Sequence, residues 1–179
     1  MHRNLLLRQL HSYRPADGHE TEMLGRITAF VEANPDCFER SQLTGHITAS
    51  ALIVNKERTR TLMTHHHKLN KWLQLGGHAD GDPDPLHTAM REAEEESGLK
   101  TIVAVSENIF DVDVHPIPAR ENEPAHFHYD IRFLFEADDS QELTITAESK
   151  ELAWIPLKEI ETFTMEESIL RMVRKLHSA

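Results

Sequence analysis

The sequence is poor in cysteine and in positive charge, and each shortage excludes a class of protein. A single cysteine, Cys37, occurs among 179 residues. No disulfide can therefore form within the chain, which suits a reducing, cytoplasmic environment. Lys and Arg total 19 against 30 Asp and Glu, a formal net charge of −11. Such an acidic chain repels a phosphate backbone, so we expect no nucleic-acid partner.

The N-terminal residues also offer little that would enter a membrane. Leu5, Leu6 and Leu7 are followed at once by Arg8. This run is too short for the core of a signal peptide or for a membrane span. We therefore expect a soluble protein with no membrane partner. Its length predicts one domain with room for a sizeable core.

The hydrophobic pattern changes along the chain. Residues 4–13 and 20–33 have the spacing of amphipathic helices, with a turn at 15–18 between them. Beyond them, strands are expected at 47–54, 61–65, 72–75, 101–114, 126–136 and 151–155, and helices from 84–85 onward and at 165–177. This mixture indicates an α/β fold with a mixed sheet covered by helices.

We assign residues 1–45 to a helical N-terminal extension that packs on the domain formed by residues 46–179. Three roles stay open for this extension. It covers the sheet, closes the site, or forms the surface of a homodimer.

Acidic residues are concentrated in the segment 91–99. Glu92, Glu94, Glu95 and Glu96 fall within five residues, just before Gly98, which is expected to end a helix. Anions near a helix C-terminus oppose its dipole at a cost of roughly 0.3–1 kcal/mol each. Carboxylates three or four residues apart also repel one another. A hard divalent cation with oxygen ligands, such as Mg²⁺, would offset this repulsion.

Helical geometry divides these acidic residues into two groups. Leu86, Ala89, Met90 and Ala93 share the expected core face. Glu92, Glu95 and Glu96 lie together on the opposite side, whereas Glu94 points elsewhere and is expected to be solvated. An ordinary charged surface helix is the alternative interpretation.

The segment from Gly77 to Leu99 resembles the Nudix box of Nudix hydrolases. That pattern is Gly, five residues, Glu, seven residues, then Arg-Glu-aliphatic-any-Glu-Glu-any-Gly-aliphatic. Seven fixed positions match over 23 residues, which makes the resemblance highly specific; they are Gly77, Arg91, Glu92, Glu95, Glu96, Gly98 and Leu99. Two positions depart from the pattern: Pro83 replaces the first box Glu, and Ala93 is small for its aliphatic position. We expect Asp82 or Asp84 to take over the missing anchor as a helix cap or as a partner of Arg91.

The resemblance implies an α/β/α sandwich and a metal site. Glu95 and Glu96 would be the principal ligands of Mg²⁺ or Mn²⁺, Glu92 a ligand or the base that orients the attacking water, and the Gly76 carbonyl a further ligand. Arg91 would steady these carboxylates through an i,i+4 ion pair. A carboxylate from outside the box would join them, with Glu121, Glu123 and Glu148 as candidates.

The resemblance also implies a reaction. Members of this family cleave the diphosphate linkage of a nucleoside diphosphate joined to another group, as in nucleoside triphosphates or nucleotide sugars. A small nucleotide-like molecule is therefore the expected substrate. Two alternatives stay open, namely an isomerase on the same fold, such as an isopentenyl-diphosphate isomerase, and a non-catalytic nucleotide-binding regulatory module. The isomerases use a catalytic cysteine, and Cys37 precedes the expected sheet.

Histidine is abundant, with 13 in the chain. His126, His128 and Asp130 alternate with Phe127, Tyr129 and Ile131, so a strand would project all three polar residues from one face. His78 and Asp80 repeat the same spacing directly after Gly77. We expect these five residues to bind substrate near the box glutamates, either as ligands of a transition metal or as phosphate donors if the imidazoles are protonated. A solvated strand face is the alternative.

Overall fold

The computed structural model describes residues 2–120, 123–147 and 149–177, which form two compact units. The first unit comprises Met1–Ser50, Gly77–Ala89 and Glu107–Phe133. The second comprises Ala51–Gly76, Met90–Ser106 and Leu134–Ala179. Within the described part of the chain, no helix combines the length and the apolar character needed to cross a membrane.

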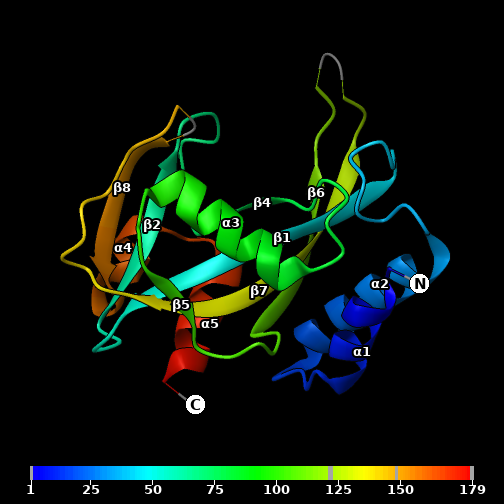
Figure 1. The fold of residues 1–179 in the computed structure, drawn as a ribbon, viewed down its shortest axis with the longest axis horizontal. Coiled ribbons are helices and arrows are strands. Elements are labelled where there is room, and N and C mark those ends of the chain that lie inside the picture. The colour runs from blue at the N-terminus through cyan, green and yellow to red at the C-terminus, as the bar shows by residue number, and fades with distance from the viewer. Residues whose placement is uncertain (1, 121–122, 148, 178–179) are drawn as a thin grey trace. The chain divides into compact units, whose positions relative to one another are not determined.

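The first unit begins with two helices that contact each other, α1 (Asn4–Ser12) and α2 (Gly18–Ala33) (Figure 1). Asp17 caps α2 by accepting a hydrogen bond from the Glu20 backbone N–H at 2.8 Å. The buried Glu20 carboxylate in turn accepts a hydrogen bond from the Tyr13 hydroxyl at 2.8 Å. These bonds fix the link between the two helices, so the helical pair predicted from the sequence is present with boundaries shifted by at most two residues.

The strands of the first unit place apolar and polar residues on opposite faces. Strand β6 (Asp111–Ile117) pairs antiparallel with the first part of β7 (His126–Ala137), with Asp113 opposite Asp130. Helix α2 packs against β6, and the Phe30 ring stacks on Tyr129 with centroids 3.9 Å apart. The other face of the same strands is polar and buried, which makes it unlike an ordinary solvated strand face.

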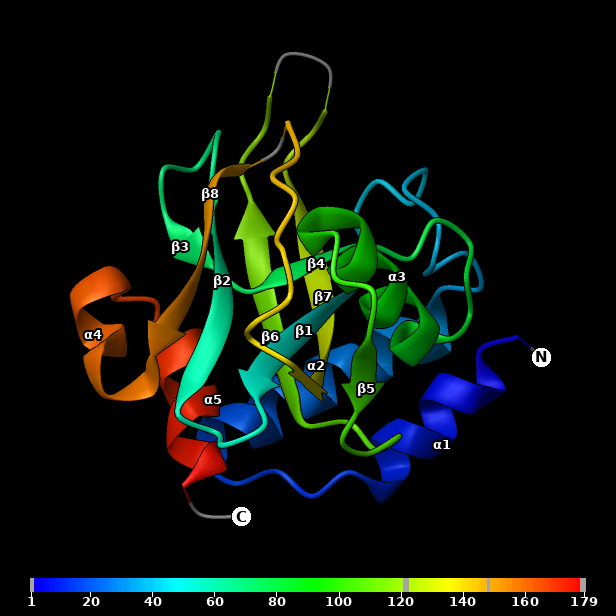
Figure 2. The ribbon, with the colours of Figure 1, turned by 60° about the vertical axis from the view of Figure 1, so that its left-hand side comes forward.

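The second unit is built around β2 (Arg60–His66), which pairs antiparallel with β3 (Trp72–Leu73) and with β8 (Ser149–Pro156). Figure 2 shows β2 and β8 running side by side. The short β5 (Ile102–Ala104) pairs with the end of β7. A single turn η1 (Leu157–Glu159), helix α4 (Ile160–Phe163) and helix α5 (Glu167–Leu176) close this unit.

Four elements run through both units: β1 (Gly45–Asn55), β4 (Leu75–His78), β7 and helix α3 (Pro85–Ser97). The pairings therefore join into one eight-stranded sheet with the order β3-β2-β1-β7-β5. In this sheet β4 pairs with β1, β6 with β7 and β8 with β2.

Three elements differ from the sequence prediction. The expected strand 72–75 is two strands, because β3 pairs with β2 whereas β4 pairs with β1. The expected strand 101–114 is interrupted between β5 and β6, although both parts pair with β7. The polar residues Glu107 and Asn108 form a bend there, as such residues favour turns. Helix α4 and turn η1 were not predicted; at seven residues together they are too short to show helical periodicity.

Candidate active site

Helix α3 carries the acidic segment, and its start is capped by the aspartates that flank Pro83. The Asp84 carboxylate accepts hydrogen bonds from the backbone N–H groups of Leu86 at 3.0 Å and His87 at 3.4 Å. Asp82 accepts a hydrogen bond from the Asp84 N–H at 2.9 Å, and its carboxylate is hydrogen-bonded to His87 Nδ1. The prediction that one of these aspartates replaces the missing box Glu as a cap is confirmed, with Asp84 as the capping residue.

Helix α3 ends as predicted at a glycine. Gly98 has φ +70° and donates its N–H to the Glu94 carbonyl at 2.9 Å. A Cβ atom at this position would lie 2.6 Å from the Thr144 side chain. Both the backbone conformation and the space therefore require glycine.

Arg91 holds two of the box carboxylates. Its Nη1 lies 2.8 Å from Glu92 Oε1 and 3.3 Å from Glu95 Oε2. The Glu92 side chain is only 14% exposed, whereas that of Glu95 is 61% exposed. The predicted i,i+4 pair between Arg91 and Glu95 is confirmed, and the pair with Glu92 adds to it. Glu94 is exposed, as expected.

Glu96 points toward the strand that precedes the box. Its Oε2 accepts a hydrogen bond from the Gly76 backbone N–H on β4 at 3.2 Å. Glu96 and Gly76, which the sequence assigned to one metal site, are thus in contact. The contact uses the N–H of Gly76, whereas the expected metal ligand is its carbonyl. The donor set is made of carboxylate oxygens, the ligands that Mg²⁺ and Mn²⁺ prefer, and so it fits the implied metal.

A second cluster is made of histidines and lies within the first unit. His46 on β1, His78 on β4 and His128 on β7 have ring centroids 4.9–5.0 Å apart. His126 is beside them, with its Nε2 3.2 Å from His128 Nε2. The prediction that His126 and His128 project from the same face of β7 is confirmed, and His78 joins them.

Burial keeps this cluster uncharged. Burial, the charge of Arg40 and the neighbouring imidazoles together lower the pKa of His78 to about 4. Burial and the neighbouring imidazoles lower the pKa of His128 to about 2. Burial also lowers the pKa of His46, with the charge of His126 as the second cause. At neutral pH these three rings are therefore neutral. Two roles were considered for His78 and His128, metal ligand and protonated phosphate donor, and their neutral rings disfavour the second.

Asp130 and Asp80 do not join the histidine cluster. Asp130 is 1% exposed, and its carboxylate accepts hydrogen bonds from Thr48, Ser50 and Arg132. It is thus a buried support of the sheet and not a group open to substrate. Asp80 forms an ion pair with Arg40 at the surface, and its role in substrate binding stays a prediction.

Arg132 is buried among three carboxylates of the same face. Its guanidinium lies 2.7 Å from Asp130, 3.0 Å from Asp113 and 3.4 Å from Asp111. These charges raise its pKa above the ordinary value in spite of the desolvation that opposes them. The guanidinium therefore stays charged and holds β6 to β7.

Sequence reasoning missed His46, although its signal is visible in hindsight. His46, Thr48 and Ser50 are polar residues at every second position of a strand that is buried throughout and otherwise apolar until its last residue, Asn55. Among the candidate carboxylates outside the box, Glu123 lies 3.7 Å from His126 Nε2. Glu121 and Glu148 lie outside the described residues.

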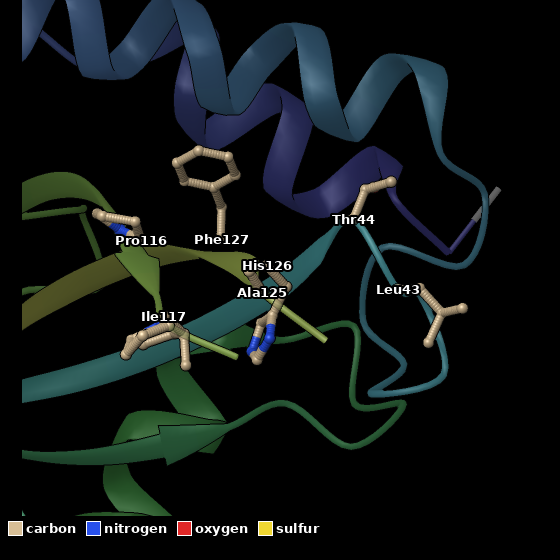
Figure 3. A pocket seen from close by; sticks show the side chains of 8 residues that line it. Leu43, Thr44, Pro116, Ile117, Ala125, His126 and Phe127 are labelled. Carbon is tan, nitrogen blue, oxygen red and sulfur yellow. The ribbon is translucent and has the colours of Figure 1, made fainter. Parts of the chain in front are cut away.

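A cavity of about 470 Å³ opens at the ends of β6 and β7. Figure 3 shows the His126 and Phe127 rings on opposite sides of the strand. The cavity is lined mainly by apolar side chains, namely Leu43, Thr44, Pro116, Ile117, Pro118, Ala125, His126 and Phe127. It offers little polar chemistry of its own beyond His126.

The mixed sheet and its helices form the α/β/α fold that the sequence resemblance implied. The NUDIX domain family model matches residues 44–176, and the chain therefore belongs to the Nudix family.

Known proteins similar to the chain support the same fold. A probable DHNTP pyrophosphohydrolase from Lactococcus lactis subsp. cremoris is 33% identical over 99 residues, which cover 53% of this chain and 56% of that relative. The chain thus aligns with little more than half the length of this relative. A C. elegans Ap4A hydrolase has a TM-score of 0.59 at 16% identity, covering 74% of this chain and 95% of the other. The E. coli dihydroneopterin triphosphate pyrophosphohydrolase has a TM-score of 0.57 at 14% identity, covering 72% and 92%.

Proposed function

We propose that the protein hydrolyses a diphosphate linkage in a nucleotide-like substrate with Mg²⁺ or Mn²⁺ as cofactor. The observation that carries this proposal is the arrangement of the box carboxylates. Arg91 holds Glu92 and Glu95, and Glu96 reaches the backbone of Gly76. On an ordinary charged surface helix, we would not expect a carboxylate to be hydrogen-bonded to the backbone of a preceding strand.

Each of the box residues has a separate role in the proposed reaction. Glu95 and Glu96, with the Gly76 backbone, would hold the metal ion. When bound, such an ion neutralises phosphate charge and lowers the pKa of a coordinated water. The Glu92 side chain is 14% exposed against 61% for Glu95, and Glu92 would orient that water and accept its proton. Arg91 positions Glu92 and Glu95 and keeps their mutual repulsion small before the metal binds.

The substrate class rests on the family and on the named relatives. Nucleoside diphosphates joined to a second group are the first candidates, and dihydroneopterin triphosphate is added because two of the similar proteins are named for it. His78, His126 and His128 are proposed to border the substrate site. They belong to the first unit and Glu92, Glu95 and Glu96 to the second, so this part of the proposal stays a prediction.

The structure supports neither of the two alternative functions. An isomerase of this fold would need a reactive cysteine, but Cys37 is fully buried and burial raises the pKa of its thiol to about 11. A non-catalytic module has no need of carboxylates held in an ordered array, which this chain retains.

The test is a substrate panel with and without Mg²⁺, measuring released phosphate and pyrophosphate. The panel contains nucleoside triphosphates, nucleotide sugars, dinucleoside polyphosphates and dihydroneopterin triphosphate. Glu96→Gln is the test variant and Glu94→Gln the matched control, because Glu94 is an exposed glutamate of the same helix. We expect metal-dependent turnover that Glu96→Gln removes and Glu94→Gln leaves unchanged. Turnover that is independent of metal, or equal in both variants, would overturn the proposal.

A further inference from the structure

One face of the first unit's sheet gathers histidines from neighbouring strands. His78 lies on β4, His46 on β1, His126 and His128 on β7, and His115 on β6. The His115 and His128 rings have centroids 5.4 Å apart. One ring nitrogen from each of His46, His78 and His128 lies within 4.8 Å of the other two. Within the described residues, this is the only group of three metal-binding side chains that converges so closely.

His46 is a buried polar residue of this cluster whose ring nitrogens lack hydrogen-bond partners in the part of the chain that the structure describes. The residue is 2% exposed, and neither of its ring nitrogens has a hydrogen-bond partner among the described residues. The Gln42 backbone lies close enough to favour the protonated ring through a weak hydrogen-bond interaction, but neither ring nitrogen makes a hydrogen bond of normal geometry to a described residue. Burying a polar group without a partner is costly, so a native protein rarely leaves one in this state. A bound cation between the three rings would take the lone pair of one of these two nitrogens.

His126 is oriented as a metal ligand usually is. Its Nδ1 lies 2.9 Å from the Pro124 carbonyl oxygen. A carbonyl can only accept, so Nδ1 carries a proton, and in the neutral ring Nε2 then holds the lone pair. Metal-binding histidines commonly donate their other ring N–H to a backbone carbonyl in this way. The Nε2 atom of His126 lies 3.2 Å from His128 Nε2.

That separation matches a metal site. Zn²⁺ binds imidazole nitrogen at about 2.0–2.1 Å in a tetrahedron, which puts two ligand nitrogens roughly 3.3 Å apart. His126 and His128 already have this spacing, whereas the rings of His46 and His78 would close in to reach it. The strands that carry them are neighbours in the sheet, so the rings can approach by movement of the side chains.

We propose that His46, His78 and His128, with His126 as fourth ligand, form a buried site for a transition-metal ion of the Zn²⁺ type. This site is distinct in its chemistry from the carboxylate site of the box. Neutral imidazoles suit Zn²⁺, Cu²⁺ or Ni²⁺, whereas Mg²⁺ prefers oxygen ligands. A metal ion here would link β4, β1 and β7, and it would therefore stabilise the fold of the first unit.

The test measures metal binding by the full chain, without a histidine tag and after removal of bound metal by a chelator. Zn²⁺ is titrated by equilibrium dialysis in excess Mg²⁺, so that carboxylate ligands are occupied by Mg²⁺. Co²⁺ is used in parallel, because its visible absorption reports tetrahedral nitrogen ligation. The variants are His46→Gln, His78→Gln and His128→Gln. His67→Gln is the matched control, because this histidine is exposed and lies outside the cluster.

We expect one Zn²⁺ per chain and a tetrahedral Co²⁺ spectrum for the wild-type protein and for His67→Gln. Each cluster variant should bind Zn²⁺ at least about tenfold more weakly, since even indirect partners of a metal site contribute that much. Thermal melting checks that the metal-free variants fold, and if His46→Gln does not, the half-buried His78→Gln decides. Equal binding by His67→Gln and the cluster variants, or loss of Zn²⁺ binding in Glu96→Gln, would overturn the proposal.

Discussion

The carboxylate of Glu96 accepts a hydrogen bond from the backbone N–H of Gly76, a residue 20 positions earlier on strand β4 (3.2 Å). This contact ties the end of the acidic helix segment to the glycine pair that opens the Nudix box. It also fixes one carboxylate oxygen of Glu96 beside the backbone of β4. The arrangement explains why a glutamate is retained at a helix C-terminus, where the dipole opposes it.

Glu95→Gln should abolish metal-dependent turnover and leave stability nearly unchanged. The side chain is mostly exposed, and its ion pair with Arg91 is of the i,i+4 kind worth about 0.3–0.5 kcal/mol. Removing the repulsion from Glu92 and Glu96 offsets part of that loss. Turnover at saturating Mg²⁺ and urea unfolding check the two halves of the prediction. Wild-type turnover in this variant would remove Glu95 from the metal site.

Asp84→Ala should destabilise the protein by about 1 kcal/mol, because the cap of α3 is lost. Asp84→Asn is the control, since an asparagine oxygen can still accept the bonds from Leu86 and His87. Urea denaturation followed by circular dichroism measures the difference. If both variants lose the same stability, the carboxylate charge and not the cap is the stabilising feature.

The local features of this chain could be predicted from its sequence, and the contacts between distant segments could not. The caps at Asp84 and Gly98 and the shared face of His126 and His128 follow from periods of a few residues. The meeting of His46 with His128 depends instead on how β1 lies beside β7, which no local pattern specifies. For the same reason Asp130 was expected at the substrate site, although its partners on β1 hold it in the interior.

Arg132→Met should destabilise the protein by roughly 3–5 kcal/mol, because the buried carboxylates of Asp111, Asp113 and Asp130 would lose their shared cation. Arg60→Met is the matched control. Arg60 pairs with Asp139 at 3.7 Å near the surface, where such a pair is worth about 0–1 kcal/mol. Urea unfolding of both variants gives the comparison. A loss below about 1 kcal/mol in Arg132→Met would show that the three carboxylates tolerate burial without it.

Cys37 should be unreactive in the native protein. The side chain is fully buried, and burial raises the pKa of its thiol from 9.0 to about 11, with the charge of Arg3 opposing part of the rise. The thiolate is the reactive form, so two pKa units reduce it roughly 100-fold. A disulfide reagent at pH 8 should therefore react at least about 100-fold more slowly with native protein than with protein unfolded in urea.

The same shift gives a sign for the pH dependence of stability. The folded state keeps the Cys37 proton to a higher pH than the unfolded state, so its contribution is complete below pH 9 and is lost as the pH rises toward 11. Cys37→Ala should therefore lose less stability than the wild-type protein between pH 9 and 11. Fast labelling of native Cys37, or identical pH profiles for both proteins, would show that the thiol is accessible, and the objection to a catalytic cysteine would then fail.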